Sequence, residues 1–208
     1  MNTFTPLPRK FYEPTAKAVA PALLGHFLIR RTAGGCCGGM IVEVEAYLTG
    51  DPAAHSFVGP TSRNLVMFGP PGHGYVYFIY GNHYCFNAVC RPPGTAEAVL
   101  VRAIEPVFGL ESLQARRAAG NLANLTNGPG KLCAAMDIGR ALDGADLCDP
   151  GSPVIIARNP ARRWFLAAHG PLVTTTRIGI TKAASLPLRF YLGGSAYVSR
   201  RRPLPGIR

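Results

Sequence analysis

The alternation of apolar and polar side chains predicts a series of β-strands in the middle of the chain. Met40–Tyr47 (MIVEVEAY) alternates with period two, as side chains do on the two faces of a strand. Tyr75–Tyr80 and Tyr84–Cys90 are β-rich runs on either side of Gly81-Asn82, which is a hairpin signal. Ala98–Ile104 predicts one more strand. These runs together predict an antiparallel meander.

Helical patterns occupy three other segments. Residues 14–24 predict a helix that Pro21 kinks or splits and that Gly25 ends. Further helices are expected at Phe108–Ala119 and at Pro129–Met136, where proline suits the first helical turn. The expected class is therefore α+β, with helices covering one side of a mostly antiparallel sheet.

The remaining segments read as short strands and turns. We expect a glycine-rich turn through Gly34–Gly39 and a loop over Asp51–Arg63. The other expected strands are Phe27–Arg31, Val154–Ala157, Arg177–Ile180 and Leu188–Tyr191. No internal repeat and no long linker divides the chain, so residues 1–208 are expected to form one domain.

Composition excludes several classes of protein. The 208 residues are 48% apolar and 16% charged, which is typical of one folded domain rather than a disordered polyelectrolyte. No apolar run approaches the roughly 18 residues of a membrane span. The N-terminal stretch lacks the apolar region of a signal peptide. We therefore expect a cytoplasmic protein with no membrane segment.

Positive charge is concentrated in the last part of the chain. The formal net charge is +11, and the segment from Gly151 to Arg208 holds ten basic residues and no acidic one. These residues are Arg158, Arg162, Arg163, Arg177, Lys182, Arg189, Arg200, Arg201, Arg202 and Arg208. Such a surface attracts nucleic acid. The alternative is a basic protein whose arginines only keep it dispersed.

The six cysteines do not form a recognisable site. They are Cys36, Cys37, Cys85, Cys90, Cys133 and Cys148, with no Cys-x-x-Cys pair and no histidines at zinc-finger spacing. We expect free thiols in a reducing compartment and no metal site.

Two acidic residues are the best candidates for chemistry. Glu43 and Glu45 lie two apart on the strand predicted over Met40–Tyr47, so both carboxylates share one face, about 7 Å apart. Charges on an otherwise apolar strand are costly unless they are paired or used. One interpretation is structural, with a solvent-facing strand or salt bridges to Arg102. The other is a general acid or base in a cleft.

Aromatic residues are frequent near these acids. They are Tyr47, His55, Phe57, Tyr75, Tyr77, Phe78, Tyr80, His83 and Tyr84. Any one of them is more often a core residue than a ligand contact, but such rings also stack on nucleobases. Stacking rings, acids near an arginine and a basic surface together suggest an enzyme that acts on a base in DNA.

Ordered sequence blocks then resemble a known family. They are EVEAY (43–47), DPAAHS (51–56), RN (63–64), MF (67–68), PG (71–72), YVYFIYG (75–81), Asn87, VLVRAIEP (99–106), NGPGKL (127–132) and PLRFY (187–191). In order and spacing they resemble the alkyladenine (3-methyladenine) DNA glycosylase family in its bacterial form, from about Phe11 to Ser199.

The resemblance implies both a fold and an activity. The fold would be a single domain with a curved, mostly antiparallel sheet flanked by helices. The activity would be hydrolysis of the N-glycosidic bond of alkylated or deaminated purines, such as 3-methyladenine, 7-methylguanine, hypoxanthine and ethenoadenine, after base flipping. The partner would be double-stranded DNA, bound by a monomer that needs no cofactor or metal. No lysine matches a Schiff-base position, so no lyase step is expected.

The resemblance also assigns roles to individual residues. Glu45 would be the general base that activates water, and Arg102, with the backbone carbonyl near Ile180, would hold that water. Tyr47, His55 and Tyr77 would sandwich the base, and Asn87 would disfavour the exocyclic amine of guanine. Tyr80 would wedge into the duplex, and Asn82 and His83 would separate the strands. Lys131 would either contact a phosphate or be structural.

Two other functions are compatible with parts of this pattern. A noncatalytic nucleic-acid-binding module could keep the fold, although loss of Glu45 or Tyr47 would have favoured it and both residues are present. Hydrolysis of a free nucleoside or sugar by Glu43 and Glu45 would leave the basic tail without a purpose.

Overall fold

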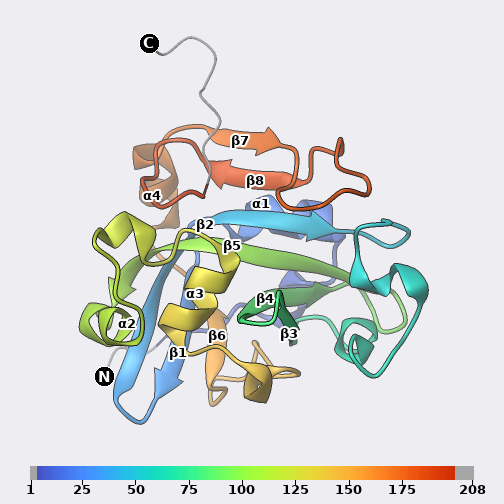
Figure 1. Cartoon of the computed structure of the whole chain (residues 1–208), viewed down its shortest axis with the longest axis horizontal. Coiled ribbons are helices and arrows are strands. Elements are labelled where there is room, and N and C mark those ends of the chain that lie inside the picture. Colours follow the sequence, from blue (N-terminus) through green and yellow to red (C-terminus); the bar gives the residue numbers. More distant parts are fainter. Residues whose placement is uncertain (1–3, 200–208) are drawn as a thin grey trace.

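Two long neighbouring strands, β2 (Gly35–Tyr47) and β5 (Glu97–Phe108), cross the centre of the fold (Figure 1). In this computed structural model, which describes residues 4–199, eight strands form one antiparallel sheet in the order β3-β4-β5-β2-β1-β6, with β8 paired to β2 and β7 to β8. The other strands are β1 (Phe27–Thr32), β3 (Gly74–Ile79), β4 (His83–Cys90), β6 (Val154–Ala157), β7 (Leu172–Thr175) and β8 (Arg189–Leu192). The sheet is open, and the predicted α+β class is confirmed.

One edge of β2 is shared between two partners. β5 follows the other edge from Gly38 to Tyr47, with irregular register around Glu43. On the shared edge, β1 pairs with residues 35–40 and β8 pairs with residues 43–45. The acidic half of β2 is therefore an interior strand of the sheet, with β5 paired to one edge and β8 to the other.

The expected turn at Gly34–Gly39 is wrong, because β2 already begins at Gly35. The reason is the close approach of neighbouring strands. A Cβ at Gly38 would lie 2.0 Å from the Leu28 carbonyl oxygen, and one at Gly39 would lie 1.9 Å from the Glu105 carbonyl oxygen. These glycines therefore allow strands to pack where larger residues would clash.

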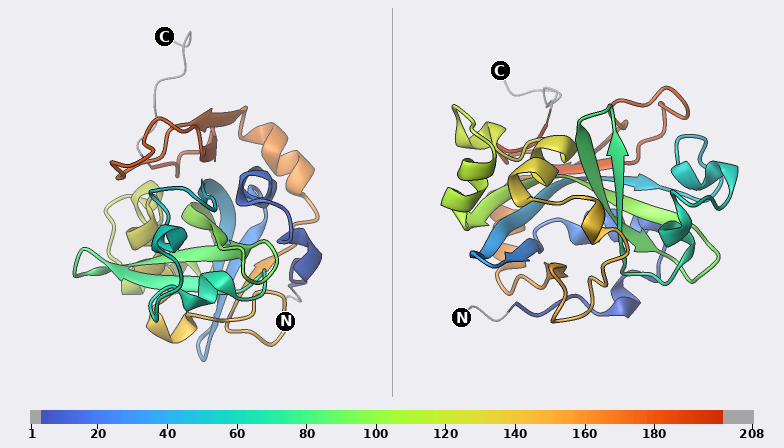
Figure 2. Two further views of the ribbon diagram at one scale, coloured as in Figure 1. Left: turned by 90° about the vertical axis from the view of Figure 1, so that its right-hand side faces the viewer. Right: turned by 60° about the horizontal axis from the view of Figure 1, so that its bottom comes forward.

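Helices cover the sheet from both sides. In Figures 1 and 2, α1 (Ala16–Leu23) lies behind β2 and β5, and α3 (Pro129–Met136) lies in front of β4 and β5. The expectation that helices cover one side is therefore wrong. The main core cluster between these layers includes Val19, Leu23, Val44, Val101, Ile104 and Leu132.

The predicted helix limits are partly right. α3 spans the expected residues, and α1 continues through Pro21 without being split. α2 (Leu110–Arg116) is shorter than expected because β5 extends to Phe108 and Gly109 then adopts a left-handed conformation with φ 61°. The predicted loop over Asp51–Arg63 contains a short 3-10 helix.

The C-terminal third differs most from expectation. α4 (Arg162–Ala168) and β7 were not predicted, and the expected strand at Arg177–Ile180 is a loop. The Ile178 amide donates to a side-chain carboxylate instead of to a neighbouring strand, which accounts for the difference.

The basic tail also contributes less surface charge than its composition suggests. Arg177 and Arg189 are buried, and Arg162 is half-buried and donates to the Leu24 carbonyl oxygen. Arg158, Arg163 and Lys182 are exposed; Arg200, Arg201, Arg202 and Arg208 lie outside the described residues. No helix between residues 4 and 199 has the length and apolar character needed to cross a membrane.

Candidate active site

A cavity of about 290 Å³ opens where β2, β3, β4 and β5 come together with two loops. Its walls carry tyrosine and histidine rings from β2, β3 and the 3-10 helix His55–Val58. Ala98 and Leu100 of β5 and residues 178–180 of the loop before β8 complete the lining. The size and the aromatic lining suit one small planar ligand.

Glu45 lies directly behind this wall. Its side chain is fully buried, and the three groups that contact its carboxylate all belong to residues that line the cavity. Oε1 accepts the Ile178 N–H at 2.8 Å and lies 3.2 Å from Nη1 of Arg102, while Oε2 accepts the Tyr47 hydroxyl at 3.0 Å. The carboxylate is therefore held in one orientation by three residues of the cavity wall, although Glu45 itself is not a lining residue.

Arg102 links the two glutamates of β2. Its Nε donates to Oε1 of Glu43 at 2.8 Å, and its Nη1 faces Glu45. Burial alone would lower the pKa of Arg102, but the charges of Glu45 and Glu43 outweigh this effect and raise the pKa. The guanidinium is therefore a fixed positive charge beside the cavity.

Glu43 is a fully paired structural carboxylate. It also accepts Nε of Arg189 at 2.8 Å, and from Ser199 it accepts the backbone N–H at 2.7 Å and the hydroxyl at 2.8 Å. The structural interpretation therefore applies to one glutamate of the pair, and the catalytic interpretation applies to the other. Glu43 takes the structural one, an ion pair with Arg102, whereas Glu45 lies at the cavity.

The aromatic residues form a connected wall. The His55 and Tyr77 ring centroids are 4.3 Å apart in an edge contact, and Nδ1 of His55 lies 2.9 Å from the Tyr75 hydroxyl. Burial, with a smaller effect of the Arg63 guanidinium, lowers the pKa of His55. Burial also raises the pKa of Tyr75 to about 12 and the pKa values of Tyr47 and Tyr77 well above the ordinary value. The rings are therefore uncharged at neutral pH.

The other expected base contacts are also at the cavity. Asn87 is buried, lines the cavity and donates through Nδ2 to the Tyr75 carbonyl oxygen at 3.1 Å. Ile180 lines the cavity as well. The backbone group that contacts Glu45, however, is the amide of Ile178, which the sequence did not single out.

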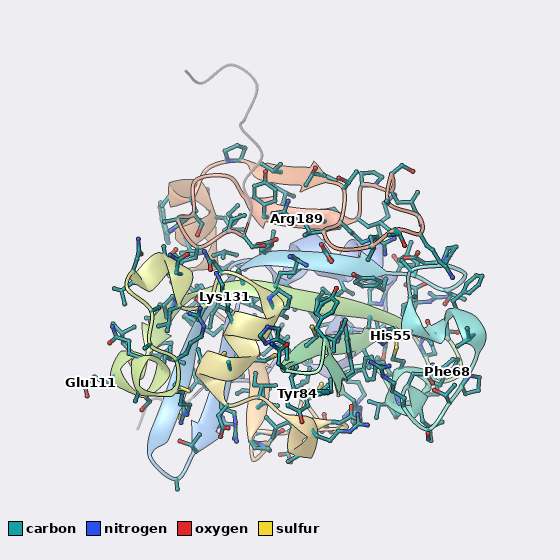
Figure 3. The ribbon with its side chains drawn as sticks, in the orientation of Figure 1. His55, Phe68, Tyr84, Glu111, Lys131 and Arg189 are labelled. Carbon is teal, nitrogen blue, oxygen red and sulfur yellow. The ribbon has the colours of Figure 1, made fainter. Side chains whose placement is uncertain are left out.

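The expected DNA contacts gather at the mouth of the cavity. Tyr80 is 75% exposed at the β3–β4 turn and lines the cavity, and Asn82 and His83 follow it on the surface. The His83 ring packs so closely on Gly130 that a Cβ there would lie 2.9 Å from it. Lys131, labelled on α3 in Figure 3, donates to Oδ1 of Asn127 at 2.7 Å. Its contact within the chain is structural.

Four supporting residues were missed by the sequence analysis as members of the site. Arg189 on β8 (Figure 3) and Ser199 hold Glu43, and Arg177 and Asp51 form a buried ion pair behind Tyr47. From composition alone, both arginines count toward the basic surface. For Arg189, the sequence did offer a sign of burial, because the residue lies inside an apolar run that predicts a strand.

The described part of the chain contains no cluster of side chains that could bind a metal ion. No three of its histidine, cysteine, aspartate and glutamate residues gather in a way that could hold an ion.

Known proteins resemble this chain over most of its length. The family described as "Methylpurine-DNA glycosylase (MPG)" matches residues 10–196. Proteins named "Putative 3-methyladenine DNA glycosylase" are 55% identical in Methanoculleus marisnigri, over 94% of this chain and 99% of that protein, and 46% identical in Carboxydothermus hydrogenoformans, over the same shares. A protein of that name from Rhodopseudomonas palustris is 47% identical over 93% of this chain and 90% of its own length. The chain belongs to the methylpurine-DNA glycosylase family.

Proposed function

We propose that the protein is a DNA glycosylase that removes alkylated or deaminated purines from double-stranded DNA. The observation that carries this proposal is the buried Glu45 carboxylate, held beside Arg102 at the wall of an aromatic cavity. A purine stacked between the rings would bring its glycosidic bond toward that carboxylate. Purines of the 3-methyladenine, 7-methylguanine, hypoxanthine and ethenoadenine class are the proposed substrates.

The reaction follows from the charges of the site. As the N-glycosidic bond breaks, positive charge develops on the sugar, and the base departs with the electron pair of the bond. The Glu45 carboxylate stabilises that charge and takes a proton from the water whose oxygen bonds to C1′ of the sugar. Arg102 keeps the carboxylate in place. Residues 178–180 supply backbone groups near the water.

The uncharged aromatic wall suits flat and electron-poor bases. Rings of Tyr47, Tyr77 and His55 line the cavity, and stacking on them makes few demands on hydrogen-bond positions. A cationic alkylated purine gains further attraction from the ring faces. We therefore infer a broad range of damaged purines, with Asn87 on the wall that meets the edge of the base.

Access to a base in a duplex requires base flipping. Tyr80 is exposed beside the cavity mouth, and Asn82 and His83 follow it at the tip of the same hairpin. We propose that Tyr80 fills the gap left by the flipped nucleotide while Asn82 and His83 keep the strands apart. Lys131 lies on α3 next to this tip and is proposed to contact a backbone phosphate.

The reaction is proposed to stop at the abasic site. A lyase step needs an amine that can form a Schiff base with the sugar. The lining of the cavity contains no lysine among the described residues. We further propose that the protein works as a monomer in the cytoplasm, without a cofactor.

A duplex that carries one hypoxanthine tests this function. Wild-type protein is expected to release the base, and the strand is expected to break at the lesion only after alkali treatment. Glu45→Gln should lower the rate of base release by about 10² to 10⁴ while DNA binding persists. Glu111→Gln is the matched control, because Glu111 is exposed on α2. Strand cleavage without alkali would contradict the monofunctional reaction. If the wild type released none of the proposed lesions, the function itself would be contradicted.

A further inference from the structure

A buried arginine lies behind one of the rings that line the cavity. The guanidinium carbon of Arg177 is 4.7 Å from the centroid of the Tyr47 ring. Tyr47 lines the cavity, whereas Arg177 is buried and does not line it. The guanidinium therefore contacts the ring from a buried position that is not part of the cavity wall.

The guanidinium donates four hydrogen bonds to its surroundings within residues 4–199, one of them from Nη2 to the Ala183 carbonyl oxygen at 3.5 Å. Its two terminal nitrogens donate to the two carboxylate oxygens of Asp51, with Nη2 to Oδ1 at 3.1 Å, and Nη1 donates to the Ala46 carbonyl oxygen at 3.1 Å. Asp51 is 4% exposed. This two-pronged contact matches the planar fork of arginine and cannot be reproduced by the single ammonium of lysine.

The same pair connects several parts of the site. Arg177 directly precedes Ile178, whose amide donates to Glu45. Asp51 also accepts the Ala53 N–H at 3.0 Å, and Ala53 and the nearby His55 both line the cavity. One ion pair thus ties the end of β2, the loop that carries His55 and the loop that contacts the catalytic carboxylate.

We propose that Arg177, through its ion pair with Asp51, is a positioning residue that holds the Tyr47 ring and the Ile178 amide in the geometry required for base excision. The inference rests on the proposed glycosylase function. Asp51 also has an electrostatic role, because it compensates the Arg177 charge directly behind a ring that receives cationic bases. Without that compensation, the cation would oppose the binding of a positively charged purine more than that of a neutral one.

Four variants test this proposal: Arg177→Met, Arg177→Lys, Asp51→Asn and the double variant Asp51→Asn/Arg177→Met. Single-turnover excision of hypoxanthine is measured with enzyme in excess, together with the melting temperature and the KM for DNA. Both Arg177 variants should lose at least tenfold in excision rate with less than a threefold change in KM. Arg163→Met is the matched control, because Arg163 is exposed on α4, and it should stay within twofold of the wild type.

The double variant separates positioning from stability. It removes both buried charges, so its melting temperature should recover relative to the single variants, while excision should remain at least tenfold below the wild type. Recovery of excision together with the melting temperature would overturn the proposal, and so would full activity of Arg177→Lys. If a single variant fails to fold, the double variant still gives this answer.

Asp51→Asn gives an independent readout that a purely structural role would not move. The ratio of 7-methylguanine to hypoxanthine excision should fall at least threefold relative to the wild type, because only the first base is cationic. An unchanged ratio would contradict the electrostatic role of Asp51. If the wild-type protein released neither base, the glycosylase function itself would fail, which is a different result from fully active variants.

Discussion

Two glutamates on one strand have different surroundings, and this difference separates structure from chemistry. Glu43 is contacted by donors from β5, β8 and the residue Ser199. Glu45 has one arginine neighbour, and its other two donors come from residues at the cavity. Glu43 accepts four hydrogen bonds within the described part of the protein, whereas the three groups that contact the Glu45 carboxylate all belong to residues that line the cavity.

Removal of the Glu43 charge should therefore affect stability. In Glu43→Gln, the buried guanidiniums of Arg102 and Arg189 lose the carboxylate that they share. We expect the free energy of unfolding to fall by about 3 to 5 kcal/mol, as when one partner of a buried ion pair is removed. Urea denaturation of the variant and the wild type measures this change. A loss below about 1 kcal/mol would show that the network does not stabilise the fold.

The sequence predicts the spacing of these acids but not the partner of each. Arg102 was identified beside them, whereas Arg189 and Ser199 were not. Arg189 is 146 residues away from Glu43 along the chain, and only the pairing of β8 with β2 brings them together. Because this contact is made by a strand pairing over such a distance, the local pattern carries no information about it.

At the scale of elements, the β3–β4 hairpin combines a strained turn with an exposed ring. Tyr80 and Gly81 both have positive φ angles, 56° and 73°. Glycine adopts this conformation without cost, but for a bulky residue it is unfavourable by about 1–2 kcal/mol. The hairpin thus holds a tyrosine where asparagine or glycine would be more stable.

Tyr80→Asn should consequently raise stability and lower activity. Asparagine tolerates the left-handed conformation, so we expect the free energy of unfolding to rise by about 0.5 to 1 kcal/mol. The ring proposed to fill the duplex is lost, so excision from double-stranded DNA should fall at least tenfold. Thermal unfolding and single-turnover excision measure the two effects. Unchanged excision would contradict the wedge role of Tyr80.

The elements show where local patterns suffice. The α3 limits and the hairpin follow from a proline at the first helical position and from a glycine at the turn, which are local signals. The start of β2 was wrong because the roles of Gly38 and Gly39 depend on strands β1 and β5. The strand predicted at Arg177–Ile180 was wrong, because the Ile178 amide donates to the Glu45 side chain of β2 instead of to another strand.

At the scale of the whole molecule, one buried histidine makes stability depend on pH. His26 is 9% exposed, and its Nδ1 accepts the Asn159 N–H at 3.3 Å. Burial, together with the charges of Arg162 and Arg158, lowers the pKa of His26 to about 4. The unfolded chain therefore binds a proton more readily than the folded one between about pH 6.5 and pH 4.

The contribution of neutral His26 to stability is present above the pKa of the unfolded chain, about 6.5. It is lost as the pH falls toward the pKa of His26 in the folded protein, about 4. The difference in unfolding free energy between the wild type and His26→Gln should shrink by about 2 kcal/mol from pH 7 to pH 4.5. Urea titrations of both proteins at the two pH values measure it, and the comparison removes the effect of other titrating groups. A constant difference would mean that His26 is not the group responsible.

The broad class was predictable because apolar periodicity and turn residues are repeated along the chain. The distribution of charge was not, since composition does not distinguish the exposed Arg158 from the buried Arg177 and Arg189. The cavity likewise depends on rings from β2, β3 and a loop that meet only after folding. The residues at its wall were identified through the family resemblance rather than through periodicity.

Single-turnover base release by Glu45→Gln, measured beside its affinity for the same lesion duplex, tests the mechanism most directly. If Glu45 activates water, the rate should fall by about 10² to 10⁴, the usual contribution of a general base, while the dissociation constant changes by less than about threefold. A variant that still releases hypoxanthine at the wild-type rate would show that another group performs the reaction.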